Sequence, residues 1–194
     1  LNVWHGTPLN RMGQDNEEER YDMGNIMRNL LMSDYIVFPN LYMEEKMSGA
    51  FNLKELYRGT ILREGYPRNS IFFDQEHGRL LKEVLGYQGC QLSVYMPTFR
   101  GRTDDVEGDT YVEQVRSYLE VIDKGMQDDQ ILLLKLHPLV QKGLDLDNYR
   151  HIRPFPSELD TYDVLNACDV LITDYSSVMY DFANTGRKII LFAY

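Results

Sequence analysis

Short apolar runs alternate with longer amphipathic stretches along nearly the whole chain. The segment Asp169–Ala183 shows this pattern most clearly, since the apolar run Val170–Thr173 leads into a polar turn and then into apolar residues at helical spacing. The run predicts a strand buried on both faces, and Ser176 or Ser177 is typical of the N-cap of the following helix. Three residues of that helix are expected to face inward: Val178, Phe182 and Ala183.

The same alternation predicts the remaining elements. We expect helices over residues 17–32, 44–51, 75–85, 110–124, 158–166 and 178–184. We expect strands over residues 2–4, 35–38, 60–63, 91–96, 131–136, 170–173 and 189–192, with a short one at Ile152. Strands that alternate with helices imply parallel sheets joined by right-handed crossovers. The fold class predicted is therefore α/β.

A glycine-containing stretch, Gly86–Gly89, separates two cycles of this pattern. It predicts an N-terminal Rossmann-like domain over residues 1–88 and a C-terminal Rossmann-like domain over residues 89–194, with a ligand cleft between the two. The chain opens in a strand-to-loop transition and stops on an apolar strand. We therefore expect the first domain to be incomplete and the second to be truncated at its end.

The charge of the chain narrows the range of partners. The formal net charge is −10, whereas a nucleic-acid-binding protein normally carries a basic stripe, so we expect no nucleic-acid partner. The acids gather in short runs, and several basic residues stand at predicted strand ends instead. A local anion-binding pocket is therefore compatible with the negative net charge of the whole chain. The basic residues concerned are Arg63, Arg68, Arg100, Arg102 and Lys135.

The cysteine spacing and the absence of known motifs exclude further classes of protein. Cys90 and Cys168 lie far apart, without a C-x-x-C or Cys/His cluster, so we expect two reduced thiols in a cytoplasmic protein and no metal site. No apolar run approaches the ~18 residues that span a bilayer. The chain also lacks the G-x-x-x-x-G-K-[ST] and G-x-G-x-x-G motifs, which disfavours a kinase, an ATPase or a standard dinucleotide enzyme. We expect no cofactor.

Two histidines stand directly after predicted strands, one in each half. His5 lies in W-H-G-T-P with Gly6 and Thr7 beside it, and His137 precedes Pro138 at the end of another strand. Imidazole suits acid–base work near neutral pH, and imidazolium stabilises phosphate charge. Each histidine alone also fits an ordinary turn. The other two histidines lack this placement, so we expect His77 on the surface and His151 in a structural role.

Other strand ends carry groups that suit phosphate. Arg68 lies in G-Y-P-R-N and Arg100 in Y-M-P-T-F-R, and a guanidinium can bind two phosphate oxygens at once. Thr98 precedes Arg100, and Asp174 precedes Ser176 and Ser177 in the strand–turn–helix unit. Because ligands of open α/β sheets bind outside the carboxyl ends of strands, the set favours an anionic, nucleotide-type substrate. A structural turn at Arg68 and a plain capped helix at the two serines remain open alternatives.

Five motifs in this order resemble those of the CDP-glycerol glycerophosphotransferases of teichoic acid synthesis. They are W-H-G-T-P, G-Y-P-R-N, Y-M-P-T-F-R, L-L-L-K-L-H-P and D-V-L-I-T-D-Y-S-S-V-M-Y-D-F-A, and together they span nearly the whole chain. The resemblance implies a GT-B fold. It further implies transfer of glycerol phosphate from CDP-glycerol to a hydroxyl of a lipid-linked teichoic acid or related polymer acceptor, with release of CMP. The setting it implies is the inner face of the cell membrane, to which the protein attaches peripherally.

The resemblance also implies roles for individual residues. His5 is the general base for the acceptor hydroxyl, and His137 holds or protonates the donor diphosphate, whose phosphates Arg100, Ser176 and Ser177 bind. The motifs do not separate a primase from a polymerase, nor glycerol from ribitol. Two alternatives stay open: a GT-B glycosyltransferase that uses UDP- or GDP-sugars, and a non-catalytic module that binds nucleotides or polyanions.

Overall fold

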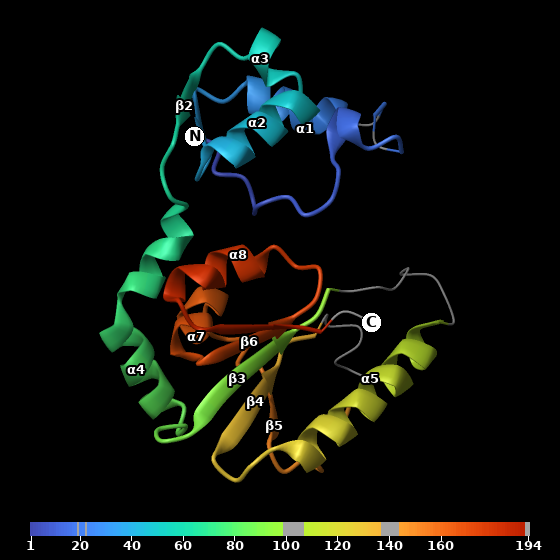
Figure 1. Cartoon of the computed structure of the whole chain (residues 1–194), viewed down its shortest axis with the longest axis vertical. Helices are drawn as coiled ribbons and strands as arrows, with labels where there is room; N and C mark the ends of the chain where they lie inside the picture. Colours follow the sequence, from blue (N-terminus) through green and yellow to red (C-terminus); the bar gives the residue numbers. More distant parts are fainter. Residues whose placement is uncertain (19, 22, 99–106, 137–143, 193–194) are drawn as a thin grey trace. The chain divides into compact units, whose positions relative to one another are not determined.

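The computed structural model describes residues 1–18, 20–21, 23–98, 107–136 and 144–192 (Figure 1). Its contacts divide the chain into two units, Leu1–Ser70 and Ile71–Tyr194. The sequence predicted the division later, at Gly86–Gly89. The intervening helix α4 (Gln75–Val84) packs closely on α7 (Thr161–Ala167), which belongs to the second unit.

One contact explains why α4 joins the second unit. Gly78 of α4 is buried, and a Cβ there would collide with the carbonyl oxygen of Asn166 on α7. The Asn166 side chain in turn donates from Nδ2 to the carbonyl oxygen of Asp74, at 2.7 Å. Only a residue without a side chain allows the two helix backbones to approach so closely.

The first unit is a small parallel sheet covered by helices. Its elements are η1 (Gly13–Asp15), α1 (Gly24–Leu31), β1 (Tyr35–Val37), α2 (Leu41–Ala50), α3 (Leu53–Leu56) and β2 (Thr60–Leu62). Strand β1 pairs in parallel with β2, and Asn2 forms a parallel bridge with Ile36 on the other side of β1. The 3-10 helix η2 (Pro67–Phe73) crosses the division between the units.

The helix predicted over residues 17–32 is shorter than its pattern suggested. Leu30 of α1 is fully buried, and Met23, Met27 and Leu31 pack against the same core. The first half of the predicted segment is not helical as far as it is described, and Tyr21 there is almost fully exposed. The acidic run before Tyr21 offers no apolar stripe to bury, so tertiary packing supports only the second half.

The second unit holds a five-stranded sheet in the order β5-β4-β3-β6-β7, with all neighbours parallel. Its elements are α4, β3 (Gln91–Met96), α5 (Glu107–Gly125), β4 (Gln130–Leu134), β5 (Ile152–Pro154), α7, β6 (Val170–Thr173), α8 (Val178–Phe182), η3 (Ala183–Thr185) and β7 (Lys188–Leu191). Strands β3 and β6 have the predicted bounds. Helix α8 ends earlier than predicted and continues as η3, and Ala183 is exposed rather than inward-facing.

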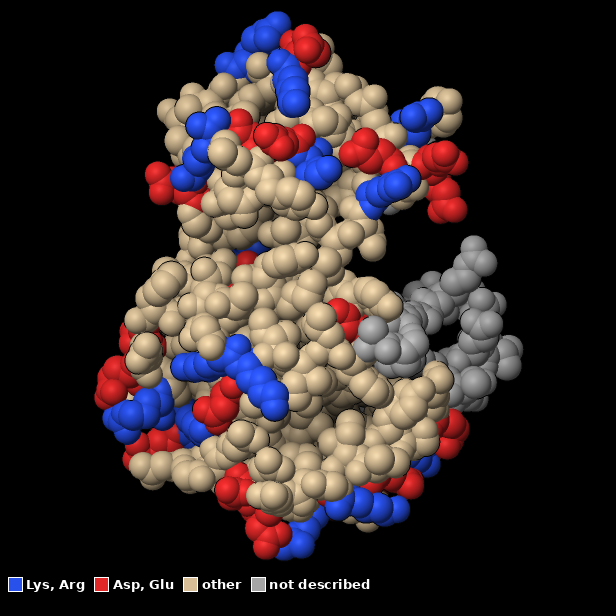
Figure 2. Space-filling model, in the orientation of Figure 1, with Lys and Arg blue, Asp and Glu red and all other residues tan. Residues whose placement is uncertain are grey.

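Helices cover both faces of this sheet (Figure 1). On one face α4, α7 and α8 pack on Leu92, Val94 and Leu171, and on the other α5 packs on Leu132 and Leu134. Successive strand residues point to opposite faces, so the near-continuous apolar runs of β3 and β4 serve both layers. Figure 2 shows acidic and basic side chains interspersed on the visible face of each unit.

The two histidines outside the motifs are both packed into the structure. His151 is buried as expected, and its backbone N–H donates to Asp123 Oδ1 at 2.8 Å. His77 was expected at the surface but is half-buried, with Nε2 3.2 Å from Asp163 Oδ1 on α7. This contact is a further link between α4 and α7.

The two free thiols differ sharply in accessibility. Cys168 is fully buried, and burial raises the pKa of its thiol to about 12, whereas Cys90 is half-buried. The thiolate is the reactive form. We therefore expect a thiol reagent at pH 8 to modify Cys90 in the native protein and Cys168 only after unfolding. Titration with Ellman's reagent with and without guanidinium chloride measures this, and rapid labelling of Cys168 in the native state would contradict it.

Gly13 begins η1 and lies against Ala50, the last residue of α2. Its φ of +55° is left-handed, and a Cβ there would collide with the carbonyl oxygen of Ala50. Gly13→Ala is expected to lower the free energy of unfolding by about 2 kcal/mol, because it adds backbone strain to a steric clash. Gly24→Ala is the matched control, since nothing lies within 4 Å of a Cβ there. Urea denaturation compares the two, and equal midpoints would refute the role of Gly13.

Candidate functional site

The order of strands in the second unit locates a topological switch point. From β3 the chain proceeds to β4 and β5 on one side of the sheet, then returns to place β6 and β7 on the other side of β3. In open α/β sheets the crevice outside the carboxyl ends of strands at such a reversal is the usual ligand site. The switch point in this protein lies at the carboxyl ends of β3 and β6.

Hydrogen bonds tie the two strand ends together at this point. The backbone N–H and the hydroxyl of Thr98 both donate to Asp174 Oδ1, at 2.8 and 2.7 Å. Within the strands themselves, the hydroxyl of Thr173, the last residue of β6, donates to the carbonyl oxygen of Met96, the last residue of β3, at 2.6 Å. Asp174 is 4% exposed, while Thr98 is exposed. The ends of β3 and β6 therefore share one edge of the sheet, as expected for parallel strands, and Asp174 holds Thr98 in place there.

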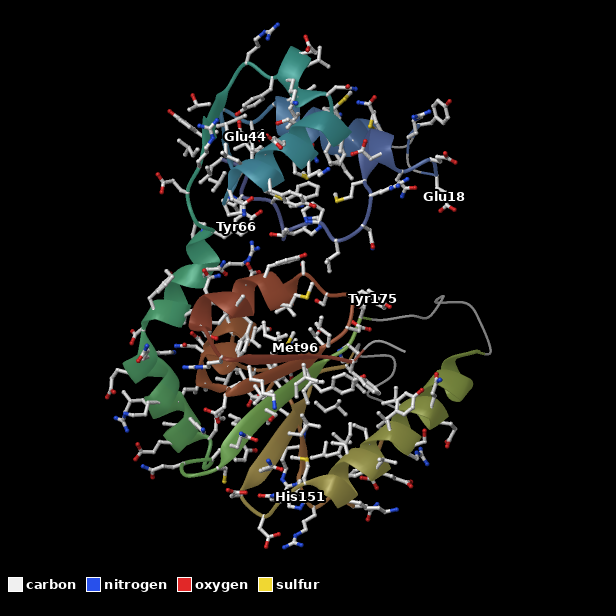
Figure 3. The ribbon with its side chains drawn as sticks, in the orientation of Figure 1. Glu18, Glu44, Tyr66, Met96, His151 and Tyr175 are labelled. Atoms are coloured by element: carbon white, nitrogen blue, oxygen red, sulfur yellow. The ribbon has the colours of Figure 1, made fainter. Side chains whose placement is uncertain are left out.

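Three of the side chains labelled in Figure 3 mark the two ends of the strands of this sheet. Met96 and Tyr175 lie at its carboxyl edge, and His151 lies at the opposite edge. This placement follows from the parallel topology, because Met96 ends β3, Tyr175 follows β6 and His151 precedes β5.

Ser176 and Ser177 lie where the strand–turn–helix prediction placed them, both half-buried at the start of α8. Ser177 occupies the N-cap position but, within the described residues, forms no side-chain cap bond. Ser176 Oγ accepts from the N–H of Val178 at 3.4 Å. Because α8 spans five residues, any anion here would depend on local N–H and hydroxyl donors more than on a helix dipole.

Lys135 adds a cation to the same edge of the sheet. It directly follows β4, an interior strand, so its side chain meets a partner: Nζ lies over the ring of Phe155, 4.1 Å from the centroid. Desolvation lowers the pKa of Lys135, and the nearby charge of Asp160 acts in the opposite direction. The sequence places this lysine at a predicted strand end but indicates no role for it.

In the first unit, His5 projects from a strained turn. Trp4 has a left-handed φ of 49°, which costs a non-glycine residue on the order of 1–3 kcal/mol. Its N–H donates to Asn2 Oδ1 at 2.9 Å, and its ring packs against Phe51. The exposed ring of His5 lies against the Trp4 ring, with centroids 4.4 Å apart. The turn thus presents an imidazole to solvent on a rigid support.

The residues around His5 support the same turn. Gly6 is buried with a φ of 155°, and Thr7 is half-buried. Arg68 Nη1 donates to the Trp4 carbonyl oxygen at 3.4 Å, and its guanidinium stacks over the Tyr66 ring at 4.1 Å. The first and second predicted motifs therefore meet. The structural reading of Arg68 is supported by these contacts, since the side chain braces the turn that carries His5.

The structure thus brings together two sets of predicted site residues. His5, Gly6, Thr7 and Arg68 share one neighbourhood in the first unit, and Thr98, Asp174, Ser176 and Ser177 share the carboxyl edge in the second. Arg100 and His137 lie outside the described residues. The supporting roles of Trp4 and Tyr66 were missed, although both aromatic residues stand in the motifs themselves.

Among the residues that the structure describes, no group of three or more His, Cys, Asp or Glu side chains could hold a metal ion. No helix within the described ranges is both long and apolar enough to cross a bilayer.

A parallel α/β sheet with polar residues gathered at its switch point defines a Rossmann-like protein of the kind that binds nucleotides. The family model described as CDP-Glycerol:Poly(glycerophosphate) glycerophosphotransferase matches residues 1–194. The chain belongs to this family.

Relatives and solved structures agree with this assignment. The chain is 30% identical to a teichoic acid poly(glycerol phosphate) polymerase of Bacillus spizizenii over 99% of its length, and 31% identical to a teichoic acid glycerol-phosphate transferase of Staphylococcus aureus over all of it. It covers 50% and 52% of those proteins, about half of each. A structure of the wall teichoic acid polymerase TagF soaked with CDPG matches 98% of the chain with a TM-score of 0.77 at 30% identity, and 47% of that protein is covered. The predicted GT-B-like α/β class is confirmed.

Proposed function

We propose that the protein transfers glycerol phosphate from CDP-glycerol to a hydroxyl group of a teichoic acid or related polymer, and releases CMP. Membership of the glycerophosphotransferase family and the likeness to a polymerase soaked with CDPG support the donor. The observation that carries the proposal is the junction of Thr98 and Asp174 at the switch point, because it orders a polar edge where a nucleotide diphosphate would bind.

The reaction proposed is a displacement at the phosphorus that carries glycerol. The acceptor oxygen bonds to this phosphorus, the bond from phosphorus to the bridging oxygen breaks, and CMP leaves with that oxygen. His5 takes the proton of the acceptor hydroxyl. Phosphoryl transfer depends mainly on positioning and on neutralising charge. In this proposal the phosphates of the donor are bound by four residues: Arg100, His137, Ser176 and Ser177.

The contacts of the remaining residues support the roles that we propose for them. Asp174 holds Thr98 at the donor site. Gly6 and Thr7 shape the turn of His5, and Arg68 braces it through the Trp4 carbonyl oxygen. These roles belong to the proposal, as does a lipid-linked acceptor at the cytoplasmic face of the membrane, which the family resemblance supports.

Titration calorimetry tests the donor. The chain is titrated with CDP-glycerol, CMP, UDP and GDP, with and without chelator. We expect the cytidine ligands to bind best, and binding to survive the chelator because the proposed donors are N–H, hydroxyl and cationic groups. Preference for UDP or GDP would favour a glycosyltransferase instead. Release of CMP upon mixing with CDP-glycerol and an oligo(glycerol phosphate) acceptor then tests transfer itself.

A further inference from the structure

The loop that follows His5 forms one wall of a pocket in the first unit. The pocket has a volume of about 410 Å³ and lies between this loop and α2. The loop contributes Pro8, Arg11 and Met12, and α2 contributes Tyr42, Lys46 and Met47.

The loop wall is held firmly in place. Gly13 approaches the Ala50 carbonyl so closely that no side chain fits between them. The next residue, Gln14, donates from Nε2 to the Gly49 carbonyl oxygen at 3.3 Å and also to Asn52 Oδ1. Both contacts fasten the loop to the end of α2, so the pocket is part of the fold of this unit.

The rim of the pocket carries cationic side chains, and its floor is apolar. Met47 and Ala50 are buried beneath it, while Arg11 and Lys46 are exposed at its rim together with one acid, Asp15. Within the described part of the chain, neither Arg11 nor Lys46 forms an ion pair, and Lys46 Nζ lies 5.7 Å from the centre of the Tyr42 ring. The lining is therefore net positive in a chain whose net charge is −10.

A local excess of cations in an acidic chain favours an anionic ligand. The apolar floor favours a ligand that also carries carbon atoms, and a polyol phosphodiester combines the two. Pro8 follows His5 by three residues, so the pocket begins at most about 11 Å along the backbone from His5. A polymer whose terminal hydroxyl lies at His5 can therefore extend into the pocket.

We propose that this pocket is an acceptor subsite that binds a phosphodiester of the polyol phosphate chain behind its reacting end. The inference rests on the proposed function, since it takes the acceptor to be such a polymer. Arg11 and Lys46 contact the phosphodiester oxygens, and the carbon atoms of the polyol lie over Met47 and Ala50. The subsite sets the preference for an acceptor that already carries several units.

Direct binding tests the subsite without turnover. Fluorescence anisotropy of a labelled oligo(glycerol phosphate) is measured with the native chain, Arg11→Gln, Lys46→Gln and the double variant. We expect each single variant to bind about threefold to tenfold more weakly, and salt to weaken native binding more than that of the double variant. Lys54→Gln, an exposed cation of the same unit outside the pocket, is the charge control. Equal affinity of all variants would overturn the subsite.

Kinetics separate this inference from the proposed function. With several-unit acceptors we expect the double variant to raise the acceptor KM by at least about tenfold and to leave the CDP-glycerol KM unchanged. With an acceptor of a single unit, the native protein and the double variant should have the same acceptor KM. This result distinguishes a polymer phosphodiester from the phosphate of a lipid linkage. Equal loss with both acceptors would overturn the polymer assignment. Absence of any transfer by the native protein would refute the function instead, and the binding measurement would still decide the subsite.

Discussion

Replacing His5 with alanine is expected to slow glycerol phosphate transfer by about 10³-fold, because general base catalysis contributes 10²- to 10⁴-fold. The imidazole is exposed and stacked on Trp4, so its removal leaves the fold of the turn in place. The affinity for CDP-glycerol should stay within about twofold of the native value, since His5 acts on the acceptor. Steady-state rates and donor titration together measure the two effects.

His77→Gln is the matched control for this experiment. His77 lies on α4 in the second unit, belongs to none of the five motifs and contacts Asp163. We expect this variant to keep its transfer rate. A His5→Ala protein with native kcat, or one that loses CDP-glycerol binding in step with its rate, would contradict the assignment of His5 as the base.

Replacing Asp174 with alanine is expected to lower both the stability of the second unit and its affinity for CDP-glycerol. The buried carboxylate accepts both the N–H and the hydroxyl of Thr98, so its loss leaves these donors without that acceptor. We expect the free energy of unfolding to fall by about 3 kcal/mol and CDP-glycerol affinity to fall at least about tenfold. Denaturant unfolding and calorimetry measure the two losses.

Two milder variants divide this effect into its parts. Asp174→Asn keeps one oxygen that can accept from Thr98, and Thr98→Val removes the hydroxyl but keeps the N–H bond. We expect both to lie between the native protein and Asp174→Ala in donor affinity. Native affinity in Asp174→Ala would show that the link between β3 and β6 does not order the donor site.

Local patterns were sufficient to predict most of the fold. The bounds of β3 and β6 agree with their apolar runs, because strands buried on both faces stand out against polar turns. The start of α1 was predicted too early, and the contacts divide the chain at Ser70 rather than at Gly86–Gly89. Both features depend on tertiary contacts. The packing of Gly78 against Asn166, for example, has no signature in the local sequence.

The candidate site could be predicted as a set of strand ends but not as a set of contacts. Thr98 and Asp174 are separated by 76 residues, and Arg68 and Trp4 by 64. Parallel topology indicates that such ends share an edge, yet it does not specify which side chains meet there. The pocket beside α2 was not predicted at all, because it depends on how one loop folds against one helix.

Trp4 is the only tryptophan of the chain, and its ring lies directly against that of His5. Besides its 14 tyrosines, the chain therefore carries a single indole fluorophore, and that indole lies beside the proposed base. Its indole emission therefore reports on this turn alone. Quenching by the neighbouring histidine, or a spectral shift when an acceptor displaces water, can be measured without a label and without correction for other indoles. The turn that presents the histidine also makes its state visible to optical spectroscopy.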